Sequence, residues 1–296
     1  MNKRKIRKIV FPVGGLGTRF LPATKSMPKE MLPVVDKPLI QYAFEEAIGA
    51  GIEQFIFITG RNKNVLSNHF DHSYELQKVL CDKEKKQELS LVKDWLPKAG
   101  NIAFVRQQEP LGLGHAVWCA RNFIGDEPFA VILADELISP KRNMIKDMCK
   151  AYEEVNSSII ACAKIDKKDT KKYGIIDPAG NNGKLIKLKG MVEKPEPSKA
   201  PSDLSITGRY ILEPQIIDYL EQQIKASRGV DGEIQLTDAM NKMLKKHDFY
   251  AMEFKDKRFD CGSKHGFLEA NIAFALERED MKEKVEKIIK EYSKGL

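Results

Sequence analysis

The sequence has little of what marks membrane, fibrous or disordered proteins. No apolar run approaches the roughly 18 residues that a membrane-spanning helix needs. Long linkers, internal repeats and low-complexity segments are absent, and the 20 Gly and 14 Pro among 296 residues lie close to ordinary globular usage. Residues 1–8 are basic like the start of a signal peptide, but the apolar stretch that follows, residues 9–13, is too short to complete one. We therefore expect a cytoplasmic globular protein.

Cysteine and histidine are scarce and scattered. The five cysteines show no CxxC spacing, and an odd number without clustering predicts reduced, mostly buried thiols rather than a disulfide framework or a zinc site. The five histidines form no HExxH motif. His69 and His72 fit one face of a helix, but no further ligand lies nearby, so an ordinary surface pair is the simpler interpretation.

The charge balance is modestly basic, at +7 from 49 Lys and Arg against 42 Asp and Glu. Such an excess favours anionic ligands without choosing between a nucleotide, a phosphosugar and nucleic acid. The basic runs at residues 3–8 and 83–86 carry no interleaved aromatic residues, which a stacking platform for nucleic acid needs. We therefore expect small anionic ligands, with no nucleic acid and no membrane as partner.

Strand and helix patterns alternate along the first half of the chain. Residues 8–13 and 54–59 are short apolar segments rich in Ile, Val and Phe, which is typical of strands. Between them, apolar residues at helical spacing follow Pro38 and end at Gly49, which predicts a helix. Strand, loop, helix and strand within about fifty residues favour a parallel sheet with helices packed on it. Residues 128–134 are almost wholly apolar, as expected for a strand covered on both faces.

The second half is mixed. Gly180-Asn181-Asn182-Gly183 lies between two strand-like segments and is a strong hairpin signal. Ser139-Pro140 is typical of the cap and first turn of a helix, which we expect to end near Val155. The tail, residues 280–294, predicts an amphipathic helix that needs the body or a partner subunit to pack on. The other expected strands are at residues 102–106, 157–164, 204–212 and 250–254, and the other helices at residues 74–88, 115–123, 214–225, 234–246 and from 263 onward.

A glycine-rich loop at residues 14–19 follows the first strand. Glycines in that position let backbone N–H groups approach a phosphate. The loop fits neither common phosphate motif, because no Lys-Thr or Lys-Ser follows at the P-loop position and Phe20 stands where the dinucleotide fingerprint needs a third Gly. From the loop residues alone, a tight turn without a ligand remains an equal alternative.

Two lysines, Lys25 and Lys29, lie among prolines just beyond this loop. A backbone fixed by proline reduces the entropy lost when a lysine head is held at a polyanion. Arg19 and Lys29 are thus placed to neutralise the outer phosphates of a nucleoside triphosphate. A solvated surface loop is the alternative interpretation.

Six motifs occur in order along the chain: residues 14–22 (GGLGTRFLP) with 29–33 (KEMLP), 107–117 (QQEPLGLGHAV), 192–195 (VEKP), 208–210 (GRY), 232–238 (GEIQLTD) and 259–262 (FDCG). Together they resemble the sugar-1-phosphate nucleotidyltransferases and, within that family, the bacterial enzymes that join UTP to glucose 1-phosphate. The resemblance covers roughly residues 8–275. One departure is Leu133-Ala134-Asp135-Glu136, since the family usually has Pro-Asp-Asp after the Leu; the sugar contact of Glu136 is therefore in question.

The resemblance implies an α/β fold of Rossmann-like, three-layer nucleotidyltransferase type, with a mixed, largely parallel central sheet. A single domain would span residues 1–296, with a nucleotide-binding half at about 8–135, a sugar-phosphate-binding half at about 136–262 and C-terminal helices at about 263–296. Homo-oligomers, either dimers or tetramers, are also typical of the family.

Site residues follow from the same motifs. Asp135 ends a buried strand at the edge where α/β sheets bind ligands, and a carboxylate there suits Mg²⁺; a turn or cap is the alternative. Asp260 is expected as a second metal ligand. Gln107 can donate and accept at once, which matches the imide edge of uracil. The full expectation is catalytic Arg19, Lys29 and Lys194; nucleotide-binding Gly14, Gly15, Gly17, Glu30, Gln107 and Gly112; sugar-phosphate-binding Gly174, Glu193, Lys194 and Glu136; and metal-binding Asp135 and Asp260.

The reaction implied by the resemblance is nucleotidyl transfer: UTP and glucose 1-phosphate give UDP-glucose and diphosphate. The attacking phosphate oxygen is already largely ionised near neutral pH, since the second phosphate pKa is about 6, so no general base is needed. Cationic side chains and Mg²⁺ reduce the repulsion between the two polyanions. Holding the attacking oxygen in line with the bond that breaks lowers the remaining barrier.

Three alternatives stay open at this stage. The same chemistry could use dTTP or another sugar 1-phosphate, because uracil and thymine differ only by a methyl group. A non-catalytic nucleotide-sugar sensor is a second alternative, although the joint presence of Lys29, Asp135, Lys194 and Asp260 argues against it. A nucleic-acid binder that uses the positive charge is the third, and salt-dependent binding would reveal it.

Overall fold

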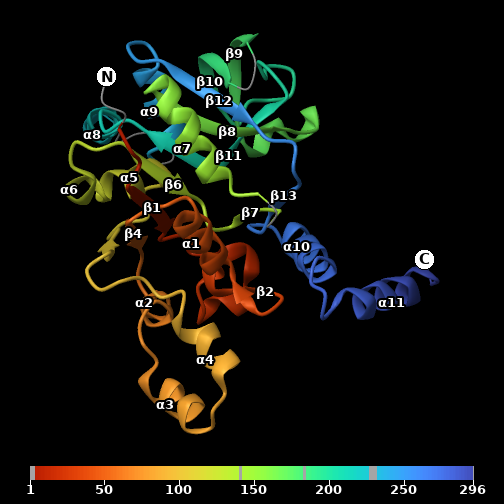
Figure 1. The fold of residues 1–296 in the computed structure, drawn as a ribbon. Coiled ribbons are helices and arrows are strands. Elements are labelled where there is room, and N and C mark those ends of the chain that lie inside the picture. Colours follow the sequence, from red (N-terminus) through yellow and green to blue (C-terminus); the bar gives the residue numbers. More distant parts are fainter. Residues whose placement is uncertain (1–3, 140–141, 183–184, 227–231, 296) are drawn as a thin grey trace.

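A nine-stranded sheet runs through the part of the chain that this computed structural model describes, residues 4–139, 142–182, 185–226 and 232–295 (Figure 1). Its strand order is β5, β4, β1, β6, β11, β8, β12, β10, β9. The strands are β1 (Lys8–Val13), β4 (Gln54–Thr59), β5 (Ile102–Arg106), β6 (Phe129–Ile132), β8 (Ser158–Lys164), β9 (Gly174–Asn182), β10 (Leu185–Glu193), β11 (Leu204–Leu212) and β12 (Phe249–Glu253).

The direction of the strands confirms a mixed, largely parallel sheet. Strand β1 pairs in parallel with β4 from Lys8↔Gln54 to Val13↔Thr59, and β4 with β5 and β1 with β6 are parallel too. Strand β11 is antiparallel to both β6 and β8, and β10 is antiparallel to β12 and β9. Among the described strands of this sheet, only β10 and β11 therefore run against the others. The carboxyl ends of β1, β4, β5 and β6 consequently meet at one edge.

Helices cover both faces of the sheet and produce three layers. Successive strand residues point to opposite faces, so Phe11 packs in a buried cluster with Phe44 of helix α1, whereas Val10 packs in a second cluster with Val117 of helix α5. The first face is covered by α1 (Leu39–Gly49) and α7 (Met144–Val155), and the second by α5 (Leu113–Cys119), α8 (Ile216–Ala226) and α9 (Leu236–Met243). The expected three-layer α/β fold is confirmed.

Two very short strands, which the sequence analysis does not predict, join distant parts of the chain. Strand β7 (Glu136–Ile138) pairs antiparallel with β13 (Arg258–Asp260), with Asp260 opposite Glu136. Leu137 and Phe259 enter a third buried cluster with Leu32. This cluster fixes the segment after the glycine-rich loop against Ala270 and Phe274 of α10 (Lys264–Leu276). Residues 135 and 260 are thereby brought side by side.

Several helices differ from the expectation. The helix expected at residues 74–88 is two helices, α3 (Tyr74–Asp82) and α4 (Lys86–Lys93), because Glu84 takes a left-handed φ of 55° between them. The helix expected at residues 115–123 is likewise α5 followed by α6 (Arg121–Ile124). The other helical elements are α2 (Asn64–His69) and the 3-10 turns η1 (Thr18–Phe20), η2 (Ala23–Lys25), η3 (Lys29–Met31) and η4 (Lys167–Lys172); strands β2 (Pro33–Val34) and β3 (Lys37–Pro38) form a small hairpin.

The expected hairpin is confirmed, because β9 and β10 pair antiparallel, but the bounds of two expected turns are corrected. Helix α7 is capped by Asn143, whose side chain accepts a hydrogen bond from Lys146 N at 2.8 Å, and not by Ser139. Pro140 lies outside the described residues. Strand β9 continues to Asn182, beyond the expected start of the turn at Gly180, and Gly183 lies outside the described residues.

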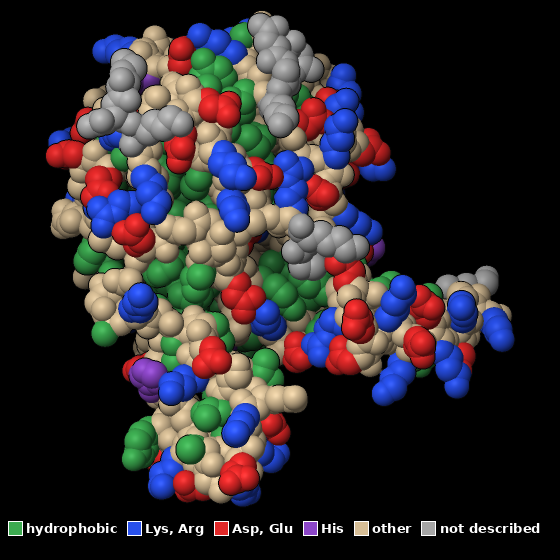
Figure 2. Space-filling view, in the orientation of Figure 1, with side chains coloured by type: hydrophobic (Ala, Val, Ile, Leu, Met, Phe, Trp, Pro, Cys, Tyr) green, Lys and Arg blue, Asp and Glu red, His purple; other side chains and the backbone are tan. Residues whose placement is uncertain are grey.

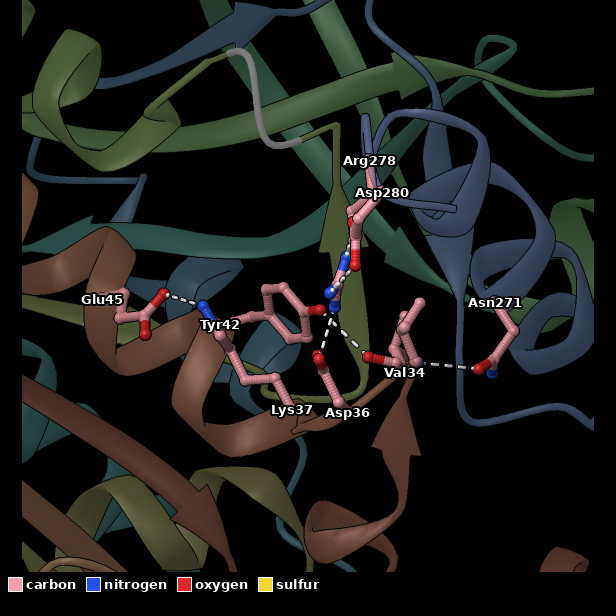
Figure 3. A network of polar contacts seen from close by, with 9 residues as sticks. Val34, Asp36, Lys37, Tyr42, Glu45, Asn271, Arg278 and Asp280 are labelled. Carbon is pink, nitrogen blue, oxygen red and sulfur yellow. Dashed lines mark hydrogen bonds and ion pairs between the residues drawn. The ribbon is translucent and has the colours of Figure 1, made fainter. Parts of the chain in front are cut away.

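The C-terminal helices are tied to the N-terminal hairpin by a polar network (Figure 3). Arg278 forms ion pairs with Asp36 and with Asp280, and Val35 N donates to Asn271 Oδ1 at 2.9 Å. Beyond this network, α11 (Lys282–Ser293) projects from the body (Figure 1) and carries interspersed positive and negative side chains (Figure 2). None of its residues is buried. Within the described residues no helix is long and apolar enough to cross a membrane.

Candidate active site

A cavity of about 1230 Å³ opens where β6, β8 and β12 end. Leu133 follows β6, and Lys164 and Glu253 are the last residues of the other two strands. In α/β sheets this edge is the usual place for a ligand. Five residues expected in the site line this cavity: Arg19, Asp135, Glu136, Lys194 and Asp260.

Asp135 and Asp260 face the same small space. A Cβ atom built on Gly262 would lie 3.0 Å from Asp135 Oδ2 and 3.1 Å from Asp260 Oδ1, so both carboxylate oxygens border the volume that glycine leaves free. Mg²⁺ is commonly held by one or two carboxylates together with water and substrate phosphates, and these two side chains fit that requirement. Among the described residues, no group of three or more His, Cys, Asp and Glu gathers into a complete metal site. Further ligands would have to come from substrate or water.

Two cations border the aspartates. Lys29 Nζ forms an ion pair with Asp135, and Arg19 Nη1 donates to Gly262 O at 3.4 Å. Burial raises the pKa of Asp135, but the Lys29 ammonium, a backbone hydrogen bond and Arg19 together lower it more, so the net pKa lies below its ordinary value. Burial lowers the pKa of Lys29, and Asp135 and Glu30 together raise it above its ordinary value. The pair therefore stays charged, and the site presents both signs of charge to a ligand.

Gln107, Gly14 and Gly112, which are expected to recognise the base, form a second group, the base group. Gln107 follows β5, is 7% exposed, and donates through Nε2 to Gly112 O at 3.1 Å. A Cβ on Gly14 would lie only 2.8 Å from Gln107 Oε1, so a larger residue there would displace the Gln107 amide. Gly112 has a φ of +92°, and a Cβ on it would lie 3.0 Å from Ile234 O. This group does not line the 1230 Å³ cavity.

Lys29 connects the base group with the cavity. A Cβ on Gly17 would lie 3.3 Å from Lys29 Cβ, and one on Gly15 would lie 3.8 Å from Lys29 Cε. The glycine-rich loop therefore packs along the Lys29 side chain, whose ammonium reaches Asp135. A ligand that spans from Gln107 to Asp135 would pass this lysine.

Three of the four residues expected at the sugar phosphate, Gly174, Glu193 and Lys194, lie in or directly after the β9–β10 hairpin, and the fourth, Glu136, begins β7. Gly174 pairs with Glu193, and a Cβ on Gly174 would lie 3.2 Å from Glu193 Oε2. Lys194 has a φ of 46°, an uncommon conformation for a residue with a side chain. Its backbone N donates to Tyr173 O at 3.1 Å, which holds that conformation, and its side chain is half-exposed at the cavity.

Glu30 and Glu136 have protein partners. Glu30 is 2% exposed and pairs with Lys63 at 2.7 Å, so its carboxylate does not open onto the cavity. Glu136 pairs with Arg258 Nε at 2.9 Å and accepts from Gly208 N at 3.2 Å. Burial raises the pKa of Glu136, and Arg258 only partly offsets this. In this arrangement Glu30 lies buried against Lys63, and its expected contact with the nucleotide stays a prediction.

Arg258 and Tyr173 are cavity residues that the sequence analysis misses. The Arg258 guanidinium lies 4.3 Å from the Tyr173 ring centroid, and its Nη1 donates to Ser205 Oγ at 3.2 Å. Its Nη2 is buried without a hydrogen-bond partner in the described part of the chain. Tyr173 OH donates to Asp260 Oδ2 at 3.3 Å. The only sequence signal for Arg258 is its place two residues before Asp260.

The chain is similar to known proteins over nearly its whole length. The family model described as Nucleotidyl transferase matches residues 9–277. The UTP–glucose-1-phosphate uridylyltransferase of Bacillus subtilis is 48% identical over 95% of each chain, and the enzyme numbered 2 of Staphylococcus saprophyticus is 47% identical over 97% of this chain and 98% of its own.

Solved structures are similar as well. A UDP-glucose pyrophosphorylase from Acinetobacter baumannii superimposes with a TM-score of 0.87 at 38% identity, covering 97% of this chain and 99% of that one. A UTP-bound form from the same organism gives 0.87 at 39% identity, covering 96% and 98%. A UDP-glucose pyrophosphorylase complexed with UDP-glucose gives 0.81 at 42% identity, covering 92% and 100%.

Proposed function

This chain belongs to the nucleotidyl transferase family, and on that premise we propose that it transfers the uridylyl group of UTP to glucose 1-phosphate, giving UDP-glucose and diphosphate. The relatives named for this reaction share almost the whole chain, and related structures carry UTP or UDP-glucose. The observation within the molecule that carries the proposal is the meeting of Asp135 and Asp260 beside Lys29 and Arg19 at the sheet edge.

Asp135 and Asp260 are the proposed ligands of Mg²⁺. When bound, Mg²⁺ would neutralise charge on the triphosphate and on the departing diphosphate. Arg19 and Lys29 would receive phosphate oxygens beside it. Because Lys29 is paired with Asp135 in this structure, its ammonium already stands where a triphosphate would meet the carboxylate.

Lys194 is proposed to hold the phosphate of glucose 1-phosphate. An oxygen of that phosphate attacks the α-phosphorus of UTP; a new P–O bond forms, the bond to the β-phosphate breaks, and diphosphate leaves with the electron pair. The attacking oxygen is already ionised near neutral pH, so the protein needs no general base. Its contribution is positioning and charge neutralisation. Gln107, with Gly14, Gly15 and Gly112, would receive uracil, and Glu193, beside Gly174, would accept hydroxyl groups of the sugar.

The proposal is tested by diphosphate release in the presence of Mg²⁺. UTP, dTTP, CTP, ATP and GTP are each combined with several sugar 1-phosphates. We expect turnover with UTP and glucose 1-phosphate. Equal or faster turnover with dTTP or another sugar would retain the chemistry and change the substrate. Folded protein that turns over no pair would overturn the proposal and favour a sensor.

The protein is further proposed to act in the cytoplasm as a single domain within a homo-oligomer. The projecting helix α11 exposes Ile288 (51%) and Tyr292 (78%), and a partner subunit would cover them. Light scattering after chromatography tests this: we expect a dimer or tetramer, and a lower mass for Ile288→Glu combined with Tyr292→Glu. A wild-type monomer at micromolar concentration would contradict it.

A further inference from the structure

The orientation of the Gln107 amide is fixed by two neighbours. Its Nε2 lies 3.1 Å from Gly112 O and 3.1 Å from His115 Nδ1. A carbonyl oxygen only accepts hydrogen bonds, so the atom facing Gly112 must be the amide nitrogen. Both amide hydrogens are then occupied, one by each neighbour. The remaining atom, Oε1, is turned toward Gly14.

The same contacts define the tautomer of His115. The amide nitrogen of Gln107 only donates, so His115 Nδ1 must accept and the ring must carry its proton on Nε2. His115 Nε2 lies 4.0 Å from Cys119 Sγ, a weak acceptor. The neutral ring therefore satisfies both of its nitrogens. A protonated ring would set a donor against the donor of Gln107.

The surroundings of His115 maintain this state. Its ring stacks on Trp118 at 5.7 Å between centroids, and the Arg121 guanidinium covers the same indole at 3.6 Å. Burial lowers the pKa of His115, Glu109 raises it, and Arg121 lowers it further, with a net decrease. His115 lines a small pocket together with Arg106 and Cys119. A neutral ring nitrogen that accepts is thus held against the Gln107 amide by stacking on Trp118.

We propose that His115 is a positioning residue that selects the base of the substrate, by holding Gln107 with its Oε1 presented to the nucleotide. This inference rests on the proposed use of UTP. Uracil offers a hydrogen-bond donor at N3, which Oε1 accepts. Cytosine has an acceptor at N3, so Oε1 repels it. Turning the amide over to suit cytosine would bring Oε1 against the oxygen of Gly112 and the lone pair of His115 Nδ1.

Thymine supplies an internal reference. It has the same N3–H group and flanking carbonyls as uracil and differs only in its methyl group. Loss of the His115 acceptor should therefore weaken the choice between UTP and CTP while it leaves the choice between UTP and dTTP unchanged. General damage to the site would not separate the two ratios in this way.

The test compares kcat/KM for UTP, CTP and dTTP, with glucose 1-phosphate and Mg²⁺ saturating, in three variants. His115→Phe keeps a ring to stack on Trp118 but has no acceptor. His115→Asn places Oδ1 where Nδ1 stands, which restores the acceptor. His115→Ala removes both the ring and the acceptor, and it replaces the Phe variant should that one fail to fold.

We expect the preference for UTP over CTP to fall about five- to tenfold in His115→Phe, as for the loss of one hydrogen bond, and to remain near wild type in His115→Asn. The preference for UTP over dTTP should stay constant throughout. An unchanged UTP-to-CTP ratio in folded His115→Phe would overturn the inference, and so would an equal loss with all three triphosphates. Wild-type protein that does not use UTP would overturn the proposed function itself, and this inference with it.

Discussion

Lys29 and Asp135 form an ion pair at the mouth of the cavity, between the loop that follows the glycines and the end of strand β6. The pair connects the base group around Gln107 with the cavity that Asp135 lines. The Lys29 ammonium balances the charge of the Asp135 carboxylate when no metal is bound. It also helps to keep the pKa of Asp135 below its ordinary value, against the effect of burial. Four predictions follow from this pair and from the residues around it.

Removal of the divalent metal should stop turnover without unfolding the protein. With excess EDTA we expect diphosphate release to fall to background, while the unfolding temperature changes by less than about 1 °C. The reason is that Lys29 balances the charge of Asp135 in the apoprotein, and free Mg²⁺ adds little stability by binding weakly. Addition of Mg²⁺ in excess of the chelator should restore the rate. A large fall in unfolding temperature with EDTA would indicate a structural metal instead.

Asp135→Asn should lower kcat by a factor on the order of 10²–10⁴, because in our proposal Asp135 is a ligand of Mg²⁺ and a neutral amide would hold that ion less well. The matched control is Asp256→Asn, which changes an acid that lines the same cavity but pairs with Arg142 at 2.9 Å. That variant should stay near the wild-type rate. The two variants are compared by their initial rates of diphosphate release, and circular dichroism verifies that both are folded. Equal rates for the two variants would remove Asp135 from the site.

Lys194→Met should raise the KM for glucose 1-phosphate and lower kcat, while the KM for UTP changes little. The lysine is placed at the cavity by a left-handed backbone, and in our proposal it contacts only the sugar phosphate before reaction. Lys199→Met is the control, since that lysine is exposed and does not line the cavity. A variant whose KM rises for UTP alone would place Lys194 at the triphosphate.

Arg258→Met should destabilise the protein by about 3–5 kcal/mol, because it leaves Glu136 buried without its cation. The loss of stability in Arg258→Met should depend on pH. The pKa of Glu136 is already raised by burial, and without Arg258 it rises further, so the protonated carboxyl is tolerated as the pH falls. We therefore expect a smaller loss of unfolding temperature at pH 5 than at pH 8.

A second substitution separates the stability of this pair from its role in the cavity. Adding Glu136→Gln to Arg258→Met removes the unpaired charge and should restore much of the stability. Activity should stay low if the guanidinium, whose Nη2 has no partner in the described part of the chain, contacts the substrate. A stability deficit that is the same at both pH values would show that Glu136 is not the source.

Much of the sheet follows from local sequence. Strands β1 and β4 are apolar runs that are buried on both faces of the sheet, and both have the predicted bounds. The partly exposed edge strand β5 has the predicted bounds as well. The short strands β7 and β13 escape prediction because each has three residues and is stabilised by the other, far along the chain. Helix breaks such as the one at Glu84 depend on a single left-handed residue that no periodicity reveals.

In the site, too, some features follow from the sequence and others depend on contacts between distant segments. Motifs indicate that Arg19, Asp135, Lys194 and Asp260 belong together, and these residues do line one cavity. The burial of Glu30 against Lys63 is invisible in sequence, because the partner comes from the start of another element. Arg258 is missed for a related reason: only the packing of Tyr173 and Ser205 around it distinguishes it from a surface cation.

The pairing of β7 with β13 also has a consequence during synthesis. Asp135 leaves the ribosome early, whereas Asp260 and the strand that positions it come near the end of the chain. A nascent chain that has already formed β1, β4, β5 and β6 still lacks the second acid. It also lacks Ile234, whose backbone is hydrogen-bonded to Leu111 and Gly114 beside the base group. Both the base group and the acid pair can therefore be expected to take their final positions only when the last third of the chain has been made.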